Sequence, residues 1–243
     1  MAQNTFERRE KKILLDTALF PEIEKRILEH FEPDPHNING EPYEICNIYF
    51  DNDNRDITRH SNSKPFFKEK LRLRSYGTPK PDSNVFFEIK RKMKRIGIKR
   101  RAILSLSDAY KFLENGIIKA DDSYMNRQVL SEIDYFIKTY DLKPMVYIGY
   151  RRNAYFDKND PSLRLTFDRD VVTRHTDLNL ESGMYGEELL PEGRILMELK
   201  FNGGTPMWFA RMMSDFGLSY SPYSKVGKEF ISSLQINNQI QKV

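Results

Sequence analysis

The amino-acid sequence predicts an α+β protein: a closed antiparallel eight-stranded β-barrel tunnel with helices packed on the outside. Three observations lead to this prediction. About eight segments alternate between apolar and polar residues with a period of two, which is typical of half-buried strands. Fewer segments carry apolar residues at helical spacing, and each of these has its own start and stop signals. Lys or Arg lies on the polar face of nearly every predicted strand.

Each predicted strand places apolar side chains on one face and polar side chains on the other, because successive strand residues point to opposite faces. The strands are expected at residues 6–14, 44–51, 68–76, 85–93, 97–103, 145–156, 162–171 and 194–201. Residues 32–40 and 78–84 are expected to form loops. No Pro-, Gly- or Ser-rich linker is long enough to divide the chain, so we expect one domain over residues 1–243.

Helices are expected at residues 21–31, 105–116, 126–140 and 205–217. Ser105, followed three residues later by Asp108, is a capping signal for the second helix, and Gly116 is its stop signal. Thr205 followed by Pro206 is a cap and first-turn pair for the fourth helix. The apolar stripe of each helix indicates packing against the sheet, so we assign no function to the Met and aromatic residues of the fourth helix.

The composition excludes several classes of protein. The 243 residues include 39 Lys and Arg against 35 Asp and Glu, and 39% are hydrophobic, which is enough for a buried core. No apolar run approaches the roughly 18 to 20 residues of a membrane-spanning helix, and residues 1–12 lack the apolar stretch of a secretory signal. A single cysteine, Cys46, excludes an internal disulfide, and the four histidines lack metal-ligand spacing. We therefore expect a soluble cytoplasmic protein without zinc or thiol chemistry.

The polar faces of the predicted strands carry mostly positive charge. Across the strands, eleven cations stand against four anions: Arg8, Lys12, Arg72, Arg74, Lys90, Lys92, Lys99, Arg101, Arg152, Arg164 and Lys200 against Glu10, Glu88, Asp168 and Glu198. The polar face of any single strand is explained by exposure to water. A solvated face normally mixes charges, however, because like charges on neighbouring strands repel each other.

If eight strands close into a barrel and helices cover the apolar face from outside, the cations line the interior. Unpaired buried charges are costly, so such an interior requires water and a strongly anionic ligand. Arg binds phosphate as a bidentate fork, and Lys binds it as a point charge. The few carboxylates indicate a divalent metal ion, because Mg²⁺ and Mn²⁺ take oxygen ligands from one or two carboxylates and from the substrate.

Nine sequence motifs occur in an order that resembles a known family. They are FERREKK, IYFDN, KLRLRSYG, FFEIKRK, IKRR, YRRNAYF, LRLTFD, LMELKF and YSKVGKEF, and together they span about residues 5–230. The ordered set resembles the catalytic domain of the vacuolar transporter chaperone (VTC) family, a polyphosphate polymerase domain within the triphosphate tunnel metalloenzyme (CYTH) superfamily. The resemblance implies a tunnel that transfers the γ-phosphate of ATP to a growing inorganic polyphosphate chain with Mn²⁺ or Mg²⁺.

The resemblance also implies roles for individual residues. Those expected to cradle the reacting phosphates are Lys12, Arg72, Arg74, Lys90, Lys99, Arg152, Arg164 and Lys225. Glu198 is expected to hold the metal ion. Further contacts with the substrate are expected from Arg8, Glu10, Lys92, Arg101, Tyr150, Lys200, Ser224 and Lys228.

The N-terminal element Arg8, Glu10, Lys12 differs from the ExExK signature of many tunnel triphosphatases, which favours the polymerase. No phosphate-sensing domain or membrane segment is recognisable, so a role at a membrane would require a membrane-protein partner. Two alternatives stay open: a tripolyphosphatase or nucleoside triphosphatase with water as acceptor, and a non-catalytic module that binds polyphosphate or inositol phosphates. We do not expect nucleic acid as a partner, because the aromatic residues mostly share the apolar face.

Overall fold

A computed structural model describes residues 5–6, 9–37, 40–94, 96–116, 123–160 and 162–240. Within these residues the strands are β1 (Thr5–Phe6), β2 (Arg9–Asp16), β3 (Phe31–Pro33), β4 (Tyr43–Asp51), β5 (Phe67–Tyr76), β6 (Asn84–Met93), β7 (Ile96–Ser105), β8 (Lys143–Asp157), β9 (Arg164–Arg174), β10 (Glu187–Glu188) and β11 (Arg194–Phe201). The helices are α1 (Phe20–Leu28), α2 (Asp56–Asn62), α3 (Leu106–Asn115), α4 (Tyr124–Tyr140), α5 (Met207–Asp215) and α6 (Lys225–Ile240), and a short 3₁₀ helix (Thr17–Leu19) precedes α1.

All described strands belong to one antiparallel sheet. The strand order is β1-β7-β6-β5-β4-β8-β9-β11-β2, with β10 beside β9 and β3 beside β8. The eight predicted strands are confirmed as β2, β4, β5, β6, β7, β8, β9 and β11, with ends that differ by a few residues. The short strands β1, β3 and β10 have no clear alternating pattern and were not predicted. The α+β class and the antiparallel sheet are therefore confirmed.

The predicted closed eight-stranded barrel is wrong, because the sheet of the described residues is open between β7 and β2. The outer edge of β7 pairs with β1 through Thr5 and Phe6, and the chain continues into β2, which pairs with β11 on the opposite side. β1 pairs only with Gly97 and Ile98 of β7, and the described residues show no backbone pairing between β7 and β2. Side chains face each other across the opening instead: Lys90 Nζ on β6 lies 4.0 Å from Glu10 Oε2 on β2.

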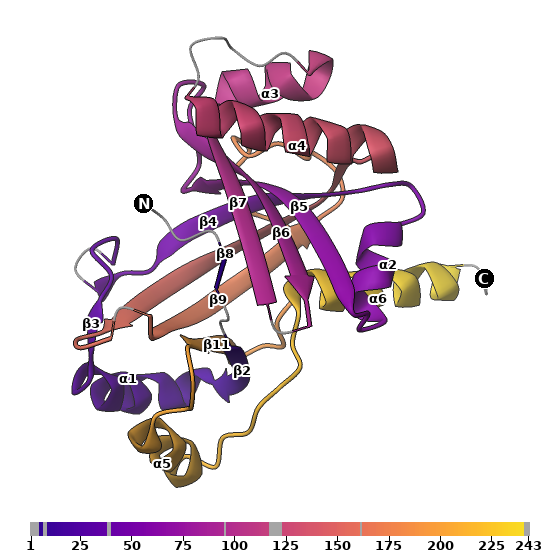
Figure 1. Cartoon of the computed structure of the whole chain (residues 1–243). Helices are drawn as coiled ribbons and strands as arrows, with labels where there is room; N and C mark the ends of the chain where they lie inside the picture. The colour runs from indigo at the N-terminus through magenta and orange to yellow at the C-terminus, as the bar shows by residue number, and fades with distance from the viewer. Residues whose placement is uncertain are drawn as a thin grey trace.

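Two pairs of helices, α3 with α4 and α1 with α5, cover the outer face of the curved sheet (Figure 1), and a hydrophobic core lies under each pair. One core packs α3 and α4 against β4 to β7 and includes Phe50, Phe87 and Phe112. The other packs α1 and α5 against β2, β9 and β11 and includes Phe167 and Phe209. Because the apolar strand faces are buried under these helices, the polar faces point into the curve of the sheet, as predicted. Helices α1, α3, α4 and α5 lie on the outside, as expected, whereas the start of α6 lies on the inner side.

Local signals explain both ends of α3. Ser105 Oγ accepts a hydrogen bond from the Asp108 backbone N–H at 3.1 Å, and Gly116 ends α3 with φ of 69°, as predicted. The predicted cap at Thr205 is wrong: α5 begins at Met207 with Pro206 in the capping position and no side-chain cap. Phe31 was predicted at the end of the first helix but begins β3, where its ring is still buried in the same core.

Helices α2 and α6 were not predicted from their sequence patterns. The first turn of α6 enters the inner side of the sheet, where Val226 packs in a small apolar cluster with Ile45, Ile148 and Leu196. This cluster fixes the start of α6 inside the curve, and the helix then runs outward toward the C-terminus (Figure 1). Over the described residues, none of the helices has both the length and the apolar character needed to cross a bilayer.

We expect Phe87→Ala to lower the free energy of unfolding by about 3–5 kcal/mol, because a large aromatic side chain leaves a cavity that the core fills only in part. Phe87 is fully buried, with ring centroids 5.9 Å from Phe50 and 5.6 Å from Phe112. Urea denaturation measures the change. The control Phe66→Ala removes a ring that is 58% exposed and should change stability by less than about 0.5 kcal/mol. Equal effects of the two variants would contradict the described packing.

Candidate anion-binding site

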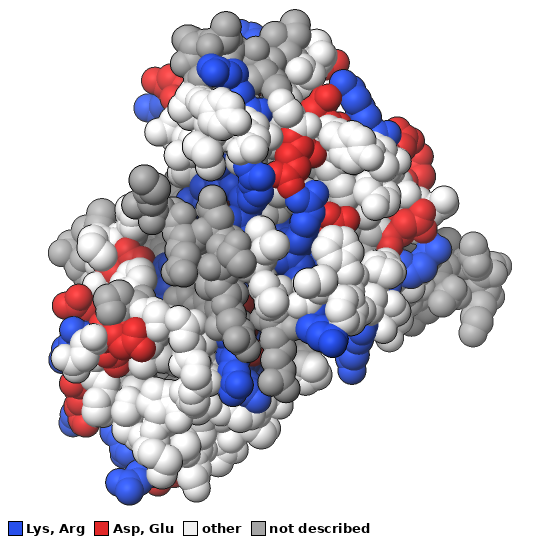
Figure 2. Space-filling view, viewed as in Figure 1, with Lys and Arg blue, Asp and Glu red and all other residues white. Residues whose placement is uncertain are grey.

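The inner face of the sheet surrounds a pocket of about 320 Å³. Figure 2 shows Lys and Arg atoms gathered around the middle of the molecule, where this pocket lies. The side chains that line it come from β2, β4 to β9, β11 and the start of α6. Among the described lining residues, twelve are Lys or Arg and three are Glu, an excess of nine positive charges: Lys12, Lys70, Arg72, Arg74, Lys90, Lys92, Lys99, Arg101, Arg152, Arg164, Lys200 and Lys225 against Glu10, Glu88 and Glu198.

Fifteen of the seventeen predicted site residues line this one pocket: Lys12, Arg72, Arg74, Lys90, Lys99, Arg152, Arg164, Lys225, Glu10, Lys92, Arg101, Tyr150, Lys200, Ser224 and Glu198. Arg8 lies outside the described residues. Lys228 is exposed on α6 and does not line the pocket. The helix runs away from the pocket, so Lys228 is about 4.5 Å further along its axis than Lys225.

Several polar lining residues were not among the predicted site residues, although Glu88 was placed with the anions of the polar strand faces. They are Tyr43, Tyr49, Lys70, Tyr76 and Glu88. Lys70 and Glu88 share the alternating face of predicted site residues on β5 and β6, so the same pattern that selected their neighbours could have selected them. The tyrosines carry no formal charge, so the pattern of cations did not indicate them, although they lie on the same strand faces as the cations.

Glu88 is the centre of one group of charges. Its carboxylate is 1% exposed and accepts hydrogen bonds from Arg72 Nε at 2.8 Å and Arg101 Nε at 2.7 Å. Lys99 Nζ and Arg74 Nη1 lie 3.5 and 3.9 Å from it. Burial alone would raise the pKa of Glu88, but these cations, Arg72 foremost, hold the pKa well below its usual range. The carboxylate thus stays ionised and gathers guanidinium and ammonium groups from the two neighbouring strands, β5 and β7.

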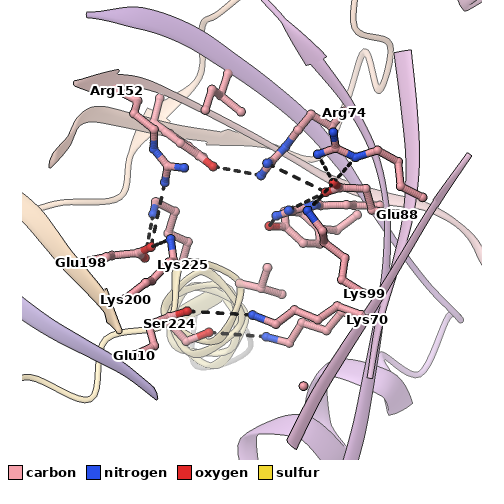
Figure 3. A pocket seen from close by; sticks show the side chains of 18 of the residues that line it. Glu10, Lys70, Arg74, Glu88, Lys99, Arg152, Glu198, Lys200, Ser224 and Lys225 are labelled. Atoms are coloured by element: carbon pink, nitrogen blue, oxygen red, sulfur yellow. Dashed lines mark hydrogen bonds and ion pairs between the residues drawn. The ribbon is translucent and has the colours of Figure 1, made fainter. Parts of the chain in front are cut away.

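Asp168 and Glu198 form a second group on the opposite wall. Arg152 donates two hydrogen bonds to Asp168, at 2.6 and 2.7 Å, and Lys225 contacts the same carboxylate. Glu198 lies 3.0 Å from Lys200, 3.3 Å from Lys12, 3.5 Å from Lys225 and 3.9 Å from Arg152. Figure 3 shows the two groups facing each other across the pocket, with α6 between and below them. The buried carboxylates therefore position most of the pocket's cations.

Four lysines face one another in pairs on β5 and β6, and we name them the lysine ladder: Lys68 with Lys92, and Lys70 with Lys90. Like charges placed directly opposite on antiparallel strands destabilise a sheet. Burial, together with the neighbouring Lys90, Lys12 and Lys68, lowers the pKa of Lys70 to about 8, although Tyr49 acts in the opposite direction. Burial also lowers the pKa of Lys68, with Lys92 and Lys90 acting in the same direction. This arrangement is relieved when an anion lies along the ladder.

Tyrosines and the start of α6 add uncharged donors to the pocket. Arg72 donates a hydrogen bond to Tyr49 Oη at 3.0 Å, and Arg74 donates one to Tyr150 Oη at 3.1 Å. Lys70 Nζ lies 3.5 Å from Ser224 Oγ, directly before the first residue of α6. The positive end of the helix dipole of α6 therefore points toward the same space as the cations, and it also favours an anion there.

Glu10 and Glu198 fit a divalent metal ion. Both carboxylates contact the Lys12 ammonium, at 3.2 and 3.3 Å, so the two groups already share one positive charge. Burial and Glu198 raise the pKa of Glu10, but Lys12, Lys90 and Lys200 lower it to about 2, so it stays ionised. Among the described residues, no three His, Cys, Asp or Glu side chains gather to hold a metal ion. A metal ion bound here would need phosphate oxygens and water as additional ligands, which is usual for Mg²⁺.

The fold and the site together define an antiparallel-sheet protein with a cation-lined interior. The sequence profile of the VTC domain family matches residues 7–232, and the chain belongs to this family. The resemblance seen in the ordered motifs is thus confirmed. No curated protein matches the chain.

Solved structures with a similar arrangement of the chain have low sequence identity. One is a candidate adenylate cyclase from Vibrio parahaemolyticus, with 14% identity, 93% of this chain and 97% of that chain covered, and a TM-score of 0.46. A protein from Pyrococcus horikoshii has 12% identity, 94% and 99% coverage and a TM-score of 0.47. A candidate adenylyl cyclase from Hippeastrum, described as having a dominant triphosphatase activity, has 14% identity, 89% and 91% coverage and a TM-score of 0.46.

We expect Lys70 and Lys200 to titrate near pH 8, because burial lowers the pKa of each ammonium to about 8. Carbon-13 NMR of labelled lysine side chains measures the titration, and the variants Lys70→Arg and Lys200→Arg assign the two signals. Saturating sulfate should move both midpoints upward, since an oxyanion favours the protonated amine. Midpoints near the ordinary lysine value of about 10.4 without anion would contradict the described crowding of charge.

Proposed function

We propose that this chain is a metal-dependent polyphosphate polymerase that transfers the γ-phosphate of ATP to a growing inorganic polyphosphate chain. One observation carries the proposal: the cations of the pocket continue beyond the two carboxylate groups into the lysine ladder. A nucleoside triphosphate needs charge neutralisation over its own phosphates only. The additional paired lysines suit a second, longer polyanion, which a polymerase requires as acceptor.

The proposed binding mode places the triphosphate among the arginines. Arg72, Arg74 and Arg152 present planar groups with several N–H donors, which suit the oxygens of adjacent phosphates. Their orientation is held by Glu88 and Asp168 before any ligand binds. Such preorganised donors stabilise the negative charge of the transferring phosphoryl group without having to reorient.

The proposed acceptor lies along the lysine ladder. Lys68 and Lys92 lie toward one end of β5 and β6, and Lys70 and Lys90 lie next to them in the direction of the arginines. A polyphosphate chain held there points its terminal oxygen toward the bound triphosphate. Phosphoryl transfer requires the attacking and leaving oxygens to be roughly in line, so positioning by fixed cations supplies most of what the reaction needs.

Glu10 and Glu198 are the proposed ligands of the metal ion. Bound there, Mg²⁺ or Mn²⁺ would neutralise part of the negative charge of the phosphates. Lys12 lies between the two carboxylates and keeps the site balanced in charge when the ion is absent. In this proposal both acidic side chains bind the metal ion, a role that a site for anions alone would not require.

The proposal is tested by incubating pure protein with ATP and Mn²⁺ and separating the products on a gel stained for polyphosphate. A ladder of long polyphosphate is expected. Arg72→Ala should lower kcat/KM by about 30- to 1,000-fold, which corresponds to about 2–4 kcal/mol of lost transition-state stabilisation. The control Arg151→Ala removes an exposed arginine and should leave the activity unchanged.

Other products would contradict the polymerase. ADP and free phosphate without polymer would establish a triphosphatase in the same pocket. Tight binding of polyphosphate without turnover, with and without metal ion, would establish a binding module. Full activity of Arg72→Ala, with the fold preserved, would show that the pocket takes no part in the reaction.

The lysine ladder predicts that polyphosphate synthesis can be weakened without weakening the binding of ATP. In the double variant Lys68→Ala/Lys92→Ala, the yield and length of polyphosphate should fall by about tenfold or more, because two of the acceptor's charge contacts are lost. The affinity for ATP should change by less than about threefold, because Arg72, Arg74 and Arg152 remain. Gel analysis and calorimetry measure the two quantities. Equal losses of both would contradict separate places for donor and acceptor.

A further inference from the structure

A cluster of aromatic rings lies at the end of the pocket that is opposite to the lysine ladder. Its members, which we name the aromatic cluster, are His36, Tyr43, Tyr76 and Phe86. Tyr43 and Tyr76 line the pocket itself. On β5, Tyr76 is the last residue and Lys68 the second, so the two lie about 26 Å apart along the strand. The two ends of the pocket therefore differ in chemistry.

Tyr76 is the centre of the aromatic cluster. The centroid of its ring lies 5.5 Å from Phe86, 6.2 Å from Tyr43 and 6.2 Å from His36. Phe86 meets it edge to face, whereas His36 lies nearly parallel to it, with 13° between the ring planes. Tyr76 is nevertheless 45% exposed, so its ring is not part of a buried hydrophobic core. A flat apolar ligand could stack on the exposed ring.

The turn that carries His36 is held firmly. Asp34 and Asn37 are both buried. Asp34 Oδ1 accepts a hydrogen bond from the His36 backbone N–H at 3.0 Å. The side-chain amide of Asn37 donates to the Ala154 carbonyl at 2.7 Å and accepts from the Ala154 N–H at 3.2 Å. Because these bonds fix the turn to β8, the imidazole has a defined place beside Tyr76.

The aromatic cluster is connected to the phosphate-binding cations. The Arg101 guanidinium lies 4.5 Å from the centroid of Phe86, and it also belongs to the Glu88 group. Arg164, which lines the pocket, lies 3.3 Å from Asp34 Oδ2, so one carboxylate contacts both this cation and the turn of His36. Burial raises the pKa of Tyr76, but Arg74 and Arg101 lower it more, which is consistent with cations beside its hydroxyl group.

We propose that the aromatic cluster is the binding site for the base of a nucleoside triphosphate, with the base stacked on Tyr76 beside His36 and the phosphates directed toward Arg74 and Arg101. This inference rests on the proposed function and adds a binding place for the base in the same pocket. Stacking recognises the face of a base and not its edge, so ATP and GTP bind similarly. Inorganic triphosphate lacks the base and gains nothing from the cluster.

The inference is tested by calorimetry with two ligands, ATP and inorganic tripolyphosphate. Tyr76→Ala should weaken ATP binding by about 5- to 150-fold, the range for loss of one stacked base. Binding of tripolyphosphate should change by less than about twofold, because its charges meet the same cations. Tyr76→Phe keeps the ring and should retain ATP affinity. Tyr135→Ala, which removes a tyrosine that is 71% exposed on α4, is the matched control and should change neither affinity.

Three results would overturn the inference. Unchanged ATP affinity in Tyr76→Ala would show that the base does not stack there. Equal losses for ATP and tripolyphosphate would assign Tyr76 to the phosphate site instead. If wild-type protein binds neither ligand, the proposed function itself fails and the inference fails with it. Binding of tripolyphosphate by wild-type protein, together with ATP affinity that is insensitive to Tyr76, rejects only the base site.

Discussion

Repulsion between cations inside a curved sheet is the constraint on which the rest of this structure depends. The described pocket lining has twelve positive and three negative side chains, so most cations have no carboxylate of their own. Glu88 and Glu198 reduce the repulsion between the cations because each carboxylate contacts four of them. The remaining excess is tolerable only where water or an anion reaches it. The proposed binding of a polyanion would neutralise this excess.

The energy that holds these charges together comes from the outside of the sheet. Residues such as Phe87 and Phe167 alternate with pocket residues along the same strands and are buried under α3, α4, α1 and α5. Burial of these rings is favourable and non-directional, so it fixes the curvature of the strands whatever their inner faces carry. The protein thus separates the two tasks: outer faces stabilise the sheet, and inner faces are left for the ligand.

Period-two alternation explains why so much could be predicted from the sequence. It assigns Leu71 and Leu73 to the core and Arg72 and Arg74 to the opposite face, and the structure agrees. Closure of the barrel could not be predicted in this way, because it depends on which edge strand takes the hydrogen bonds of β7. The short β1 pairs with Gly97 and Ile98 of β7, and its two residues carry too little pattern to be recognised.

Residues without formal charge show a second limit of the sequence pattern. Tyr76 sits on the predicted inner face, but nothing in its local sequence distinguishes a pocket tyrosine from an ordinary strand residue. Its significance comes from His36, which lies 6.2 Å away in space and forty positions earlier in the chain. The turn that carries His36 is fixed by Asn37 against Ala154, a contact between distant parts of the chain. Only tertiary structure brings these rings together.

A site built from charge alone would leave the direction of its substrate undefined. A row of phosphates is nearly the same when read from either end, and fixed cations neutralise it equally well in both orientations. An ordered transfer from donor to acceptor needs a feature that only one end of one substrate can recognise. The aromatic cluster at one end of β5 and the lysine ladder at the other provide such an asymmetry. The uncharged rings would then decide which phosphate is terminal, and hence which bond the cations help to break.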